Sequence, residues 1–81
     1  MKVELTAVAK KRFQKLPRHE AQKVARKLLS LETAPFSGKK LQGKLRDRYS
    51  LKSWPYRIIY VVELKRKTVQ IETIEHRQGV Y

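Results

Sequence analysis

The sequence predicts an α+β fold, in which an N-terminal short strand and a helical hairpin pack on one face of an antiparallel sheet of about four strands. Three observations support this prediction. Apolar residues recur at helical spacing in the N-terminal part, they alternate with polar residues in the C-terminal part, and proline or glycine marks the connections. Short connections favour antiparallel neighbours, and a sheet of this kind gives two amphipathic helices a face to cover.

The N-terminal part contains one predicted strand and two predicted helices. Residues 2–5 alternate between polar and apolar side chains, and Thr6 is a suitable N-cap for a helix over residues 7–16. Pro17 ends this helix and suits the first turn of the next. The second helix, over residues 18–32, is the most regular element, because five apolar residues share one face: Ala21, Val24, Ala25, Leu28 and Leu29. Its basic side would also suit a membrane surface or a calmodulin-like groove, but the following sheet favours packing in the core.

Three strands are predicted after a loop that is rich in proline, serine and glycine. We expect them at residues 48–53, 56–64 and 68–74. Proline cannot donate a hydrogen bond to a strand ladder, so Trp54–Pro55 is assigned to the turn between the first two strands. We expect Trp54 to anchor this turn against the sheet.

Net charge is the strongest compositional signal. The chain has 81 residues, and 20 Lys and Arg residues against 7 Asp and Glu residues give a net charge of +13. The length suits a single domain over residues 1–81. Because this charge repels itself in a compact fold, a polyanionic partner is the simplest explanation for it. Nucleic acid and an acidic protein are candidate partners, an anionic membrane is a weaker one, and a merely soluble basic protein is the alternative.

The absence of cysteine excludes several kinds of site. A chain with 0 cysteines has no disulfide framework, no thiolate nucleophile and no zinc–thiolate cluster. This composition suits the reducing cytoplasm. No N-terminal signal peptide and no membrane-spanning segment is predicted, so we expect a cytoplasmic protein without membrane contact.

Alternation along the strands predicts a cluster of cations on the face that the helices leave open. Lys52 and Arg57 point to that face, and His76 joins them if the third strand continues beyond residue 74. Arg77 lies just beyond the strand end. The open face of an antiparallel sheet is routinely polar, so a solvated surface explains the pattern equally well.

Such a cluster suits the cleavage of RNA by its own 2′-hydroxyl group. This reaction needs a base for the 2′-OH proton, fixed cations for the charge on the phosphoryl oxygens, and an acid for the leaving 5′-oxygen. Arginine is always charged and binds phosphate through two donors, and histidine titrates nearest to neutral pH. Tyr81 could stack on a base or join proton transfer. No metal or other cofactor is required, and the sequence offers no cluster of metal ligands.

Four motifs in the second half of the chain resemble the RelE/ParE toxin superfamily. They are L-x-G-x-L at 41–45, Y-x-L-K at 49–52, Y-R-I-I-Y at 56–60 and H-R-x-x-V-Y at 76–81. With the helical hairpin before them, the likeness covers essentially the whole chain. It implies a type II toxin with a helical hairpin on an antiparallel sheet. RelE-like members cleave mRNA in the ribosomal A site without a metal, and a cognate antitoxin blocks them.

The resemblance also implies roles for individual residues. Carried over by position, Lys52 matches a basic residue of the catalytic strand, Arg57 the arginine of the Y-R motif, and Arg77 the C-terminal arginine. Tyr81 matches a terminal tyrosine that stacks on the substrate or helps to cleave it, and His76 matches a position that is histidine in many relatives. Three further residues are expected to contact the mRNA or the ribosomal RNA: Lys44, Arg46 and Arg48.

The chain departs from the RelE-like pattern at Ser50, where these enzymes commonly carry a second basic residue. Arg48 lies on the same predicted face and is expected to supply part of the missing charge, with reduced nuclease activity as the consequence. The departure keeps open the ParE-like branch, whose members poison DNA gyrase and lack the nuclease residues. A nucleic-acid-binding module without catalysis is a third alternative. A RelE-like function is favoured over a ParE-like one by the four residues that are retained: Lys52, Arg57, Arg77 and Tyr81.

Overall fold

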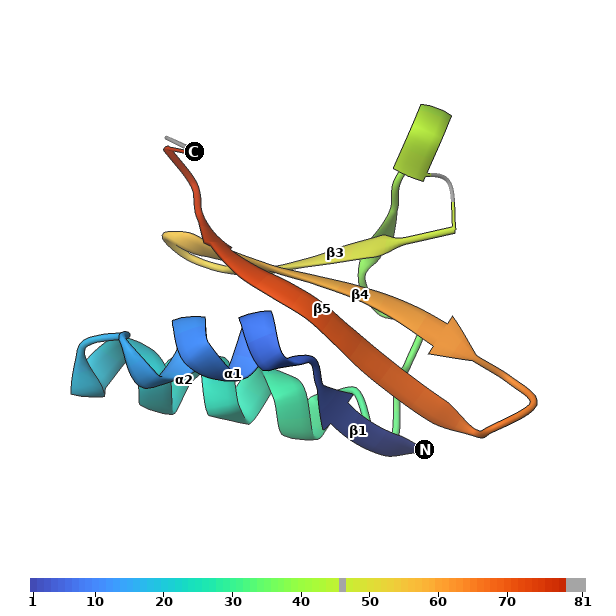
Figure 1. Cartoon of the computed structure of the whole chain (residues 1–81), viewed down its shortest axis with the longest axis horizontal. Coiled ribbons are helices and arrows are strands. Elements are labelled where there is room, and N and C mark those ends of the chain that lie inside the picture. The colour runs from blue at the N-terminus through green and yellow to red at the C-terminus, as the bar shows by residue number, and fades with distance from the viewer. Residues whose placement is uncertain (46, 79–81) are drawn as a thin grey trace.

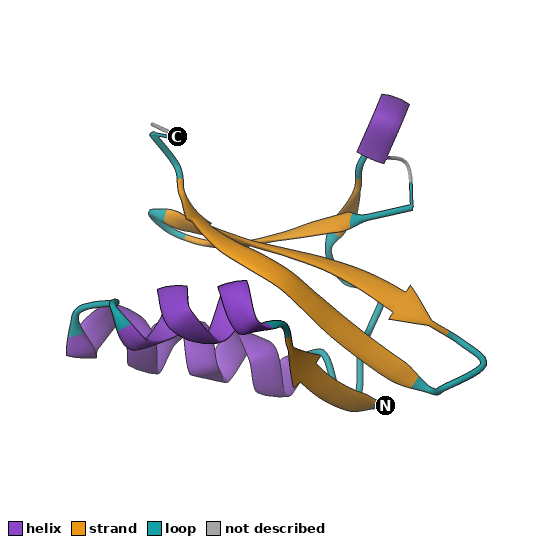
Figure 2. Ribbon diagram, in the orientation of Figure 1, coloured by secondary structure: helices purple, strands orange, loops and turns teal. Residues whose placement is uncertain are grey.

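The computed structural model describes residues 1–45 and 47–78 of the chain. It confirms the predicted α+β class, with two helices packed on a mixed sheet of five strands (Figure 2). The helices and strands follow one another in this order: β1 (Lys2–Leu5), α1 (Ala7–Gln14), α2 (Arg18–Ser30), β2 (Lys39–Lys40), the 3₁₀ helix η1 (Gly43–Leu45), β3 (Tyr49–Ser53), β4 (Tyr56–Glu63) and β5 (Thr68–His76).

The strand order in the sheet is β1-β5-β4-β3-β2. β1 runs parallel to β5, and the other pairs are antiparallel. Both helices lie under one face of this sheet, while η1 and the turn after β5, residues 77–78, rise on the other side (Figure 1). The face opposite the helices is called the open face below. Neither of these helices is long and apolar enough to cross a membrane.

Local signals explain where the helices begin. The Thr6 side chain accepts a hydrogen bond of 3.1 Å from the Ala9 N–H, as an N-cap residue does, and α1 follows directly. The same hydroxyl donates to the carbonyl of Glu72 at 2.7 Å, which ties the start of α1 to β5. Pro17 directly precedes α2, where its missing N–H is of no consequence.

The core lies between the helices and the sheet. Val24 and Leu28 of the predicted apolar face of α2 are buried, whereas Leu29 remains 63% exposed. The fully buried side chains of largest volume are Tyr60, Leu31, Ile58, Ile71, Val24 and Val69. Burial of this apolar surface is the main contribution to the stability of so small a fold.

Tyr60 fixes the loop before β2. Its ring stacks on Tyr49 at a centroid distance of 5.4 Å, and its hydroxyl accepts a hydrogen bond of 2.9 Å from the Gly38 N–H. Burial raises the pKa of the Tyr60 phenol, and the hydrogen bond from Gly38 offsets only part of that effect. A Cβ atom on Gly38 would lie 2.7 Å from the Tyr60 hydroxyl, so only glycine allows this close approach.

A β-bulge in β5 changes which residues of that strand face the core. The register of β4 with β5 shifts between Ile59 and Tyr60, leaving Glu72 as an extra residue on β5. One extra residue inverts the alternation that follows it. Ile74 is therefore buried at 3% exposure, although uninterrupted alternation predicts it on the open face with His76.

Candidate functional site

Two cations lie directly opposite each other on the open face. Lys52 of β3 and Arg57 of β4 are register partners, so their side chains leave the sheet on the same side. Both are exposed, and neither forms an ion pair with a carboxylate in the described part of the chain. Like charges at opposed positions destabilise a strand pair. An anion bound between them would remove this repulsion, which makes the pair a candidate binding site.

A third cation joins this pair at the end of β5. Arg77 lines a pocket of about 210 Å³ together with Lys52 and Arg57. These three residues, to which the resemblance gives roles in one site, therefore meet at one pocket although they come from separate segments. The full lining of this pocket, called the arginine pocket below, is Lys52, Trp54, Pro55, Tyr56, Arg57 and Arg77.

Trp54 orients Arg77 in the arginine pocket. The guanidinium carbon of Arg77 lies 4.4 Å from the centroid of the Trp54 ring, a distance typical of a cation–π contact. The Arg77 N–H also donates to the Pro55 carbonyl at 2.6 Å. The prediction that Trp54 anchors its turn against the sheet is wrong, because the side chain is 61% exposed and contacts an arginine instead.

Helix α2 holds the turn that carries Trp54. The Lys23 ammonium group donates to the Trp54 carbonyl at 3.0 Å and lies 3.6 Å from the Glu20 carboxylate. Because this hydrogen bond links the turn to α2, it fixes the position of Trp54, whose ring contacts Arg77. Lys23 is a positioning residue that the sequence pattern did not single out.

Two more pockets meet the arginine pocket at Lys52. One, the edge pocket, has a volume of about 650 Å³ and lies where β2 ends; its lining is Lys27, Ser37, Gly38, Lys39, Leu41, Ser50, Leu51, Lys52 and Arg57. The other, of about 420 Å³, extends toward α2 and is lined by Lys23, Arg26, Lys27, Lys52, Ser53 and Trp54. All three pockets share Lys52, which places this lysine at the centre of a continuous basic surface.

His76 does not lie on the open face, contrary to the expectation from alternation. It is the register partner of Tyr56, and the two rings meet edge to face at a centroid distance of 5.2 Å. The physical reason is the bulge at Glu72, which inverts the faces to which the following side chains of β5 point. The Nδ1 atom of His76 accepts a hydrogen bond of 3.1 Å from the Gln78 N–H, so His76 supports the turn that carries Arg77.

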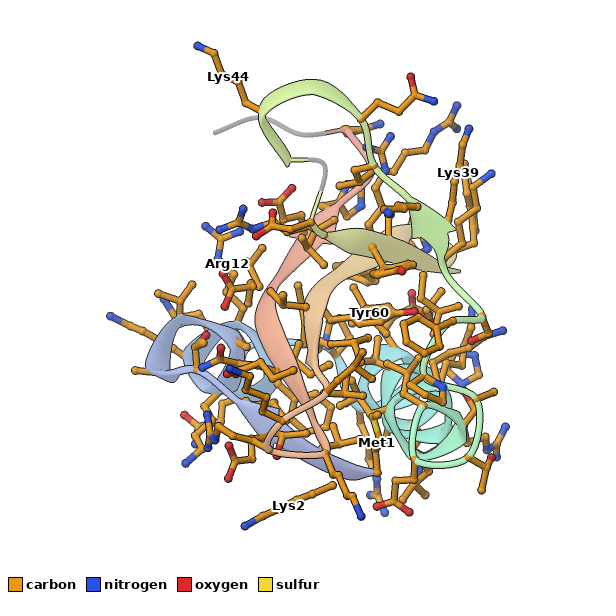
Figure 3. All side chains as sticks on the ribbon, turned by 90° about the vertical axis from the view of Figure 1, so that its right-hand side faces the viewer. Met1, Lys2, Arg12, Lys39, Lys44 and Tyr60 are labelled. Atoms are coloured by element: carbon orange, nitrogen blue, oxygen red, sulfur yellow. The ribbon has the colours of Figure 1, made fainter. Side chains whose placement is uncertain are left out.

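The remaining predicted residues differ in their surroundings. Arg48 does not stand alone on the open face, because its guanidinium group forms ion pairs of 3.2 Å with both Asp47 and Glu72. Lys44 is exposed on η1, on the half of the molecule away from the helices (Figure 3). Arg46 and Tyr81 lie outside the described residues.

Lys39 is a further cation of the surface that sequence reasoning missed. It belongs to a strand of only two residues, which alternation cannot detect. The available signal was its place in the sequence Gly-Lys-Lys before a predicted strand, where a short edge strand would pair and present one lysine to each face.

The arrangement can hold one phosphodiester group. Three basic side chains around a small pocket provide charge and directed donors, and two of them are arginines, which match phosphate oxygens. Residues 1–45 and 47–78 contain no group of three His, Asp or Glu side chains that could hold a metal ion.

The chain matches known proteins in both sequence and fold. A family model described as ParE toxin of type II toxin–antitoxin system, parDE, matches residues 3–81. A chain of the toxin–antitoxin complex RelBE2 from Mycobacterium tuberculosis is 28% identical with a TM-score of 0.86, over 94% of this chain and 96% of that one. No curated protein matches the chain in sequence.

Two further solved structures are similar. A chain of the archaeal RelE–RelB complex from Pyrococcus horikoshii OT3 is 28% identical with a TM-score of 0.80, over 99% of this chain and 97% of that one. The isolated E. coli RelE toxin, at 24% identity, has the same fold with a TM-score of 0.80 over 93% of this chain and 82% of its own. The chain therefore belongs to the ParE toxin family, and it is a toxin of a type II toxin–antitoxin system within the RelE/ParE superfamily.

Proposed function

We propose that this toxin is a ribosome-dependent endoribonuclease that cleaves mRNA in the A site. One observation carries the proposal: Lys52, Arg57 and Arg77 come from three separate segments and line one pocket. A phosphodiester gains negative charge on its oxygens in the transition state, and fixed cations in a preformed pocket stabilise that charge. The proposed target is in the cytoplasm, where ribosomes translate.

The proposed reaction is an attack of the 2′-oxygen on the neighbouring phosphorus. The O2′–P bond forms while the P–O5′ bond breaks, which leaves a 2′,3′-cyclic phosphate and a free 5′-hydroxyl group. The 2′-OH proton passes to a base, and an acid delivers a proton to the leaving O5′. Arg57 and Arg77 stabilise the phosphoryl oxygens, while Lys52 either contacts the phosphate as an ammonium group or accepts the proton as a neutral amine. These cations supply the charge compensation, so the proposed mechanism needs no metal or cofactor.

His76 and Tyr81 complete the proposed site at its C-terminal side. His76 faces Tyr56 rather than the open face, which favours a role in positioning the turn of Arg77 over direct proton transfer. Tyr81 follows Arg77 by four residues. We assign it the stacking on the substrate base or the proton donation that the motif implies.

Arginine-to-alanine variants test this proposal in cells. Arg57→Ala and Arg77→Ala should each lower mRNA cleavage by about 100-fold or more, because each removes a donor to the transition-state oxygens. Growth arrest and primer-extension mapping of ribosome-bound mRNA measure the effect. Lys65→Ala is the matched control, since it removes an exposed charge at the β4–β5 turn, at the opposite end of β5 from Arg77 (Figure 1). Unchanged cleavage in both arginine variants would remove the assignment.

A second candidate function is inhibition of DNA gyrase without nuclease activity. The match to the ParE family model favours it. This function predicts DNA-damage signalling and inhibited supercoiling with intact mRNA. Expression of the toxin alone, followed by parallel measurement of translation and plasmid supercoiling, separates the two candidates.

We also propose that a cognate antitoxin binds this toxin, as partners bind in the RelBE2 and RelE–RelB complexes. An apolar pocket of about 330 Å³ beside α2 is lined by Val3, Ala25, Leu28, Leu29 and Glu32. An amphipathic helix could place its apolar face there, and acidic residues of the same partner would suit the net charge of +13.

An exposed leucine at this pocket gives a test with a matched control. Leu29→Asp should abolish binding of the product of the adjoining gene, because it places a charge in the apolar contact. Leu64→Asp changes a leucine of similar exposure, 64% against 63%, which follows β4 and does not line this pocket, and it should bind normally. Binding at physiological salt can be measured by titration calorimetry. Equal affinity of both variants would contradict this placement of the partner.

A further inference from the structure

We propose that Lys39 is an additional phosphate-binding residue of the RNA site, and that it supplies the second cation that position 50 lacks. The inference rests on the proposed function, because it extends the same site along the bound RNA. Lys39 of β2 and Ser50 of β3 are register partners in an antiparallel pair. Their side chains therefore leave the sheet on the same face.

That face is the open face, where Lys52 and Arg57 lie. Ser50 and Lys52 are two residues apart on β3, so their side chains point the same way. Adjacent strands are separated by about 4.8 Å, and the four-carbon stem of a lysine is long enough to cross that spacing. The Lys39 ammonium group can thus occupy the space above the Ser50 hydroxyl.

The edge pocket brings these groups together. Lys39, Lys52 and Arg57 line the same pocket, with Ser50 between them. Among the residues that the structure describes, no carboxylate lines it. Figure 3 shows Lys39 on the half of the molecule away from the helices. With Lys27 of α2, which also lines it, the pocket offers four positive charges to one ligand.

Lys39 is available for an anion, whereas Arg48 is engaged. Lys39 is exposed and has no ion pair with any carboxylate of residues 1–45 and 47–78. Arg48, which the sequence suggested as compensation for Ser50, instead binds Asp47 and Glu72 at 3.2 Å each. Its charge is partly neutralised by these two carboxylates. Lys39 is therefore the better source of the missing charge.

The loop around β2 holds Lys39 in this orientation. On one side of the strand, the Gly38 N–H donates to the buried Tyr60 hydroxyl at 2.9 Å. On the other side, the Leu41 N–H donates to the Arg48 carbonyl at 2.9 Å. These bonds fix the register of β2 on both sides, so Lys39 and Lys40 cannot exchange faces without breaking them.

The edge pocket and the arginine pocket share Lys52 and Arg57. A single strand of RNA whose reacting phosphate lies in the arginine pocket would have a neighbouring phosphate in the edge pocket. We therefore assign Lys39 to a phosphate adjacent to the one that is cleaved, as a residue that binds and orients the strand.

The test compares the two lysines of β2 in an RNA-binding assay that needs no ribosome. Affinity for a short 2′-O-methyl RNA oligonucleotide, which cannot be cleaved, is measured by fluorescence anisotropy over a range of salt concentrations. Lys39→Ala should reduce the slope of log K against log salt by about 0.7, and weaken binding about fivefold near 0.1 M salt. Lys40→Ala is the matched control, because Lys40 pairs with Tyr49 and faces the other side.

The second part of the test restores a positive charge on the neighbouring strand. Ser50→Lys in the Lys39→Ala background should return the slope to that of the wild type, because both positions present their side chain to the same pocket. Equal slopes for Lys39→Ala and Lys40→Ala, or no recovery with Ser50→Lys, would overturn the inference. A toxin that leaves mRNA intact but shows these slope changes would refute the proposed nuclease while supporting the assignment of Lys39.

Discussion

Replacement of Tyr60 by Phe tests whether the core fixes the strand that carries Lys39. The phenylalanine ring should keep the stacking on Tyr49, so the buried apolar surface is nearly unchanged. The variant loses the acceptor of the Gly38 N–H, a partly buried donor that the hydroxyl binds at 2.9 Å. A buried donor without a partner costs about 1–2 kcal/mol. For a domain of this size, that loss lowers Tm by about 5–15 °C.

The Tyr60 hydroxyl also predicts how stability depends on alkaline pH. Burial raises the pKa of the Tyr60 phenol in the folded state, so the unfolded chain binds fewer protons above pH ~10, the ordinary pKa of tyrosine. The contribution of Tyr60 is complete below that value and is lost as the pH rises through the raised pKa. Tyr60→Phe removes this group, and its free energy of unfolding should fall less steeply than that of the wild type as the pH rises above about 10.

Thermal unfolding followed by circular dichroism measures both effects. Tyr49→Phe is the control, because it removes a hydroxyl from the stacked neighbour and leaves the bond between Gly38 and Tyr60 in place. The reasoning is refuted if Tyr60→Phe unfolds at the temperature of Tyr49→Phe, or if both variants lose stability with pH in parallel.

Three further predictions concern the loops and the open face. Gly38→Ala should lower the free energy of unfolding in urea by about 1–3 kcal/mol, because its Cβ would lie 2.7 Å from the Tyr60 hydroxyl; an unchanged midpoint would contradict this packing. Gly43→Ala should lower the free energy of unfolding by about 1 kcal/mol, and Gly43→Asn should lower it less, because a φ of 72° strains the alanine backbone although nothing lies near the added Cβ. Equal stability of the two variants would contradict this explanation. Glu75→Gln should strengthen RNA binding about two- to fivefold at low salt, because Glu75 is the register partner of Arg57 and repels phosphate; no gain in anisotropy titrations would place its carboxylate away from the RNA.

Periodicity predicted the parts of the fold that repeat regularly. The strand over residues 2–5, the helical hairpin and the turn at Trp54–Pro55 follow from alternation, helical spacing and proline. The bulge at Glu72 could not be predicted from propensity, because it depends on how β5 pairs with β4. The sequence did carry one signal for the bulge. Ile74 is apolar at a position where uninterrupted alternation expects a residue of the open face, and this mismatch indicates a change of face.

Only the part of the candidate site that lies within regular strands could be predicted from alternation. Lys52 and Arg57 share the open face as expected, because β3 and β4 are regular, and the structure adds that the two residues are register partners. The contact of Arg77 with Trp54 depends on side-chain conformations beyond the end of a strand, where no period applies. Lys39 was missed because two residues are too few to show a pattern.

Cleavage of mRNA on stalled ribosomes by the purified toxin is the most direct measurement of the central claim. The message carries a labelled 5′ end and either a normal codon or a single 2′-deoxynucleotide at the A site. The account predicts a cut in the normal codon that leaves a 2′,3′-cyclic phosphate, and no cut at the 2′-deoxynucleotide. An intact normal message, with gyrase supercoiling inhibited by the same preparation, would contradict it.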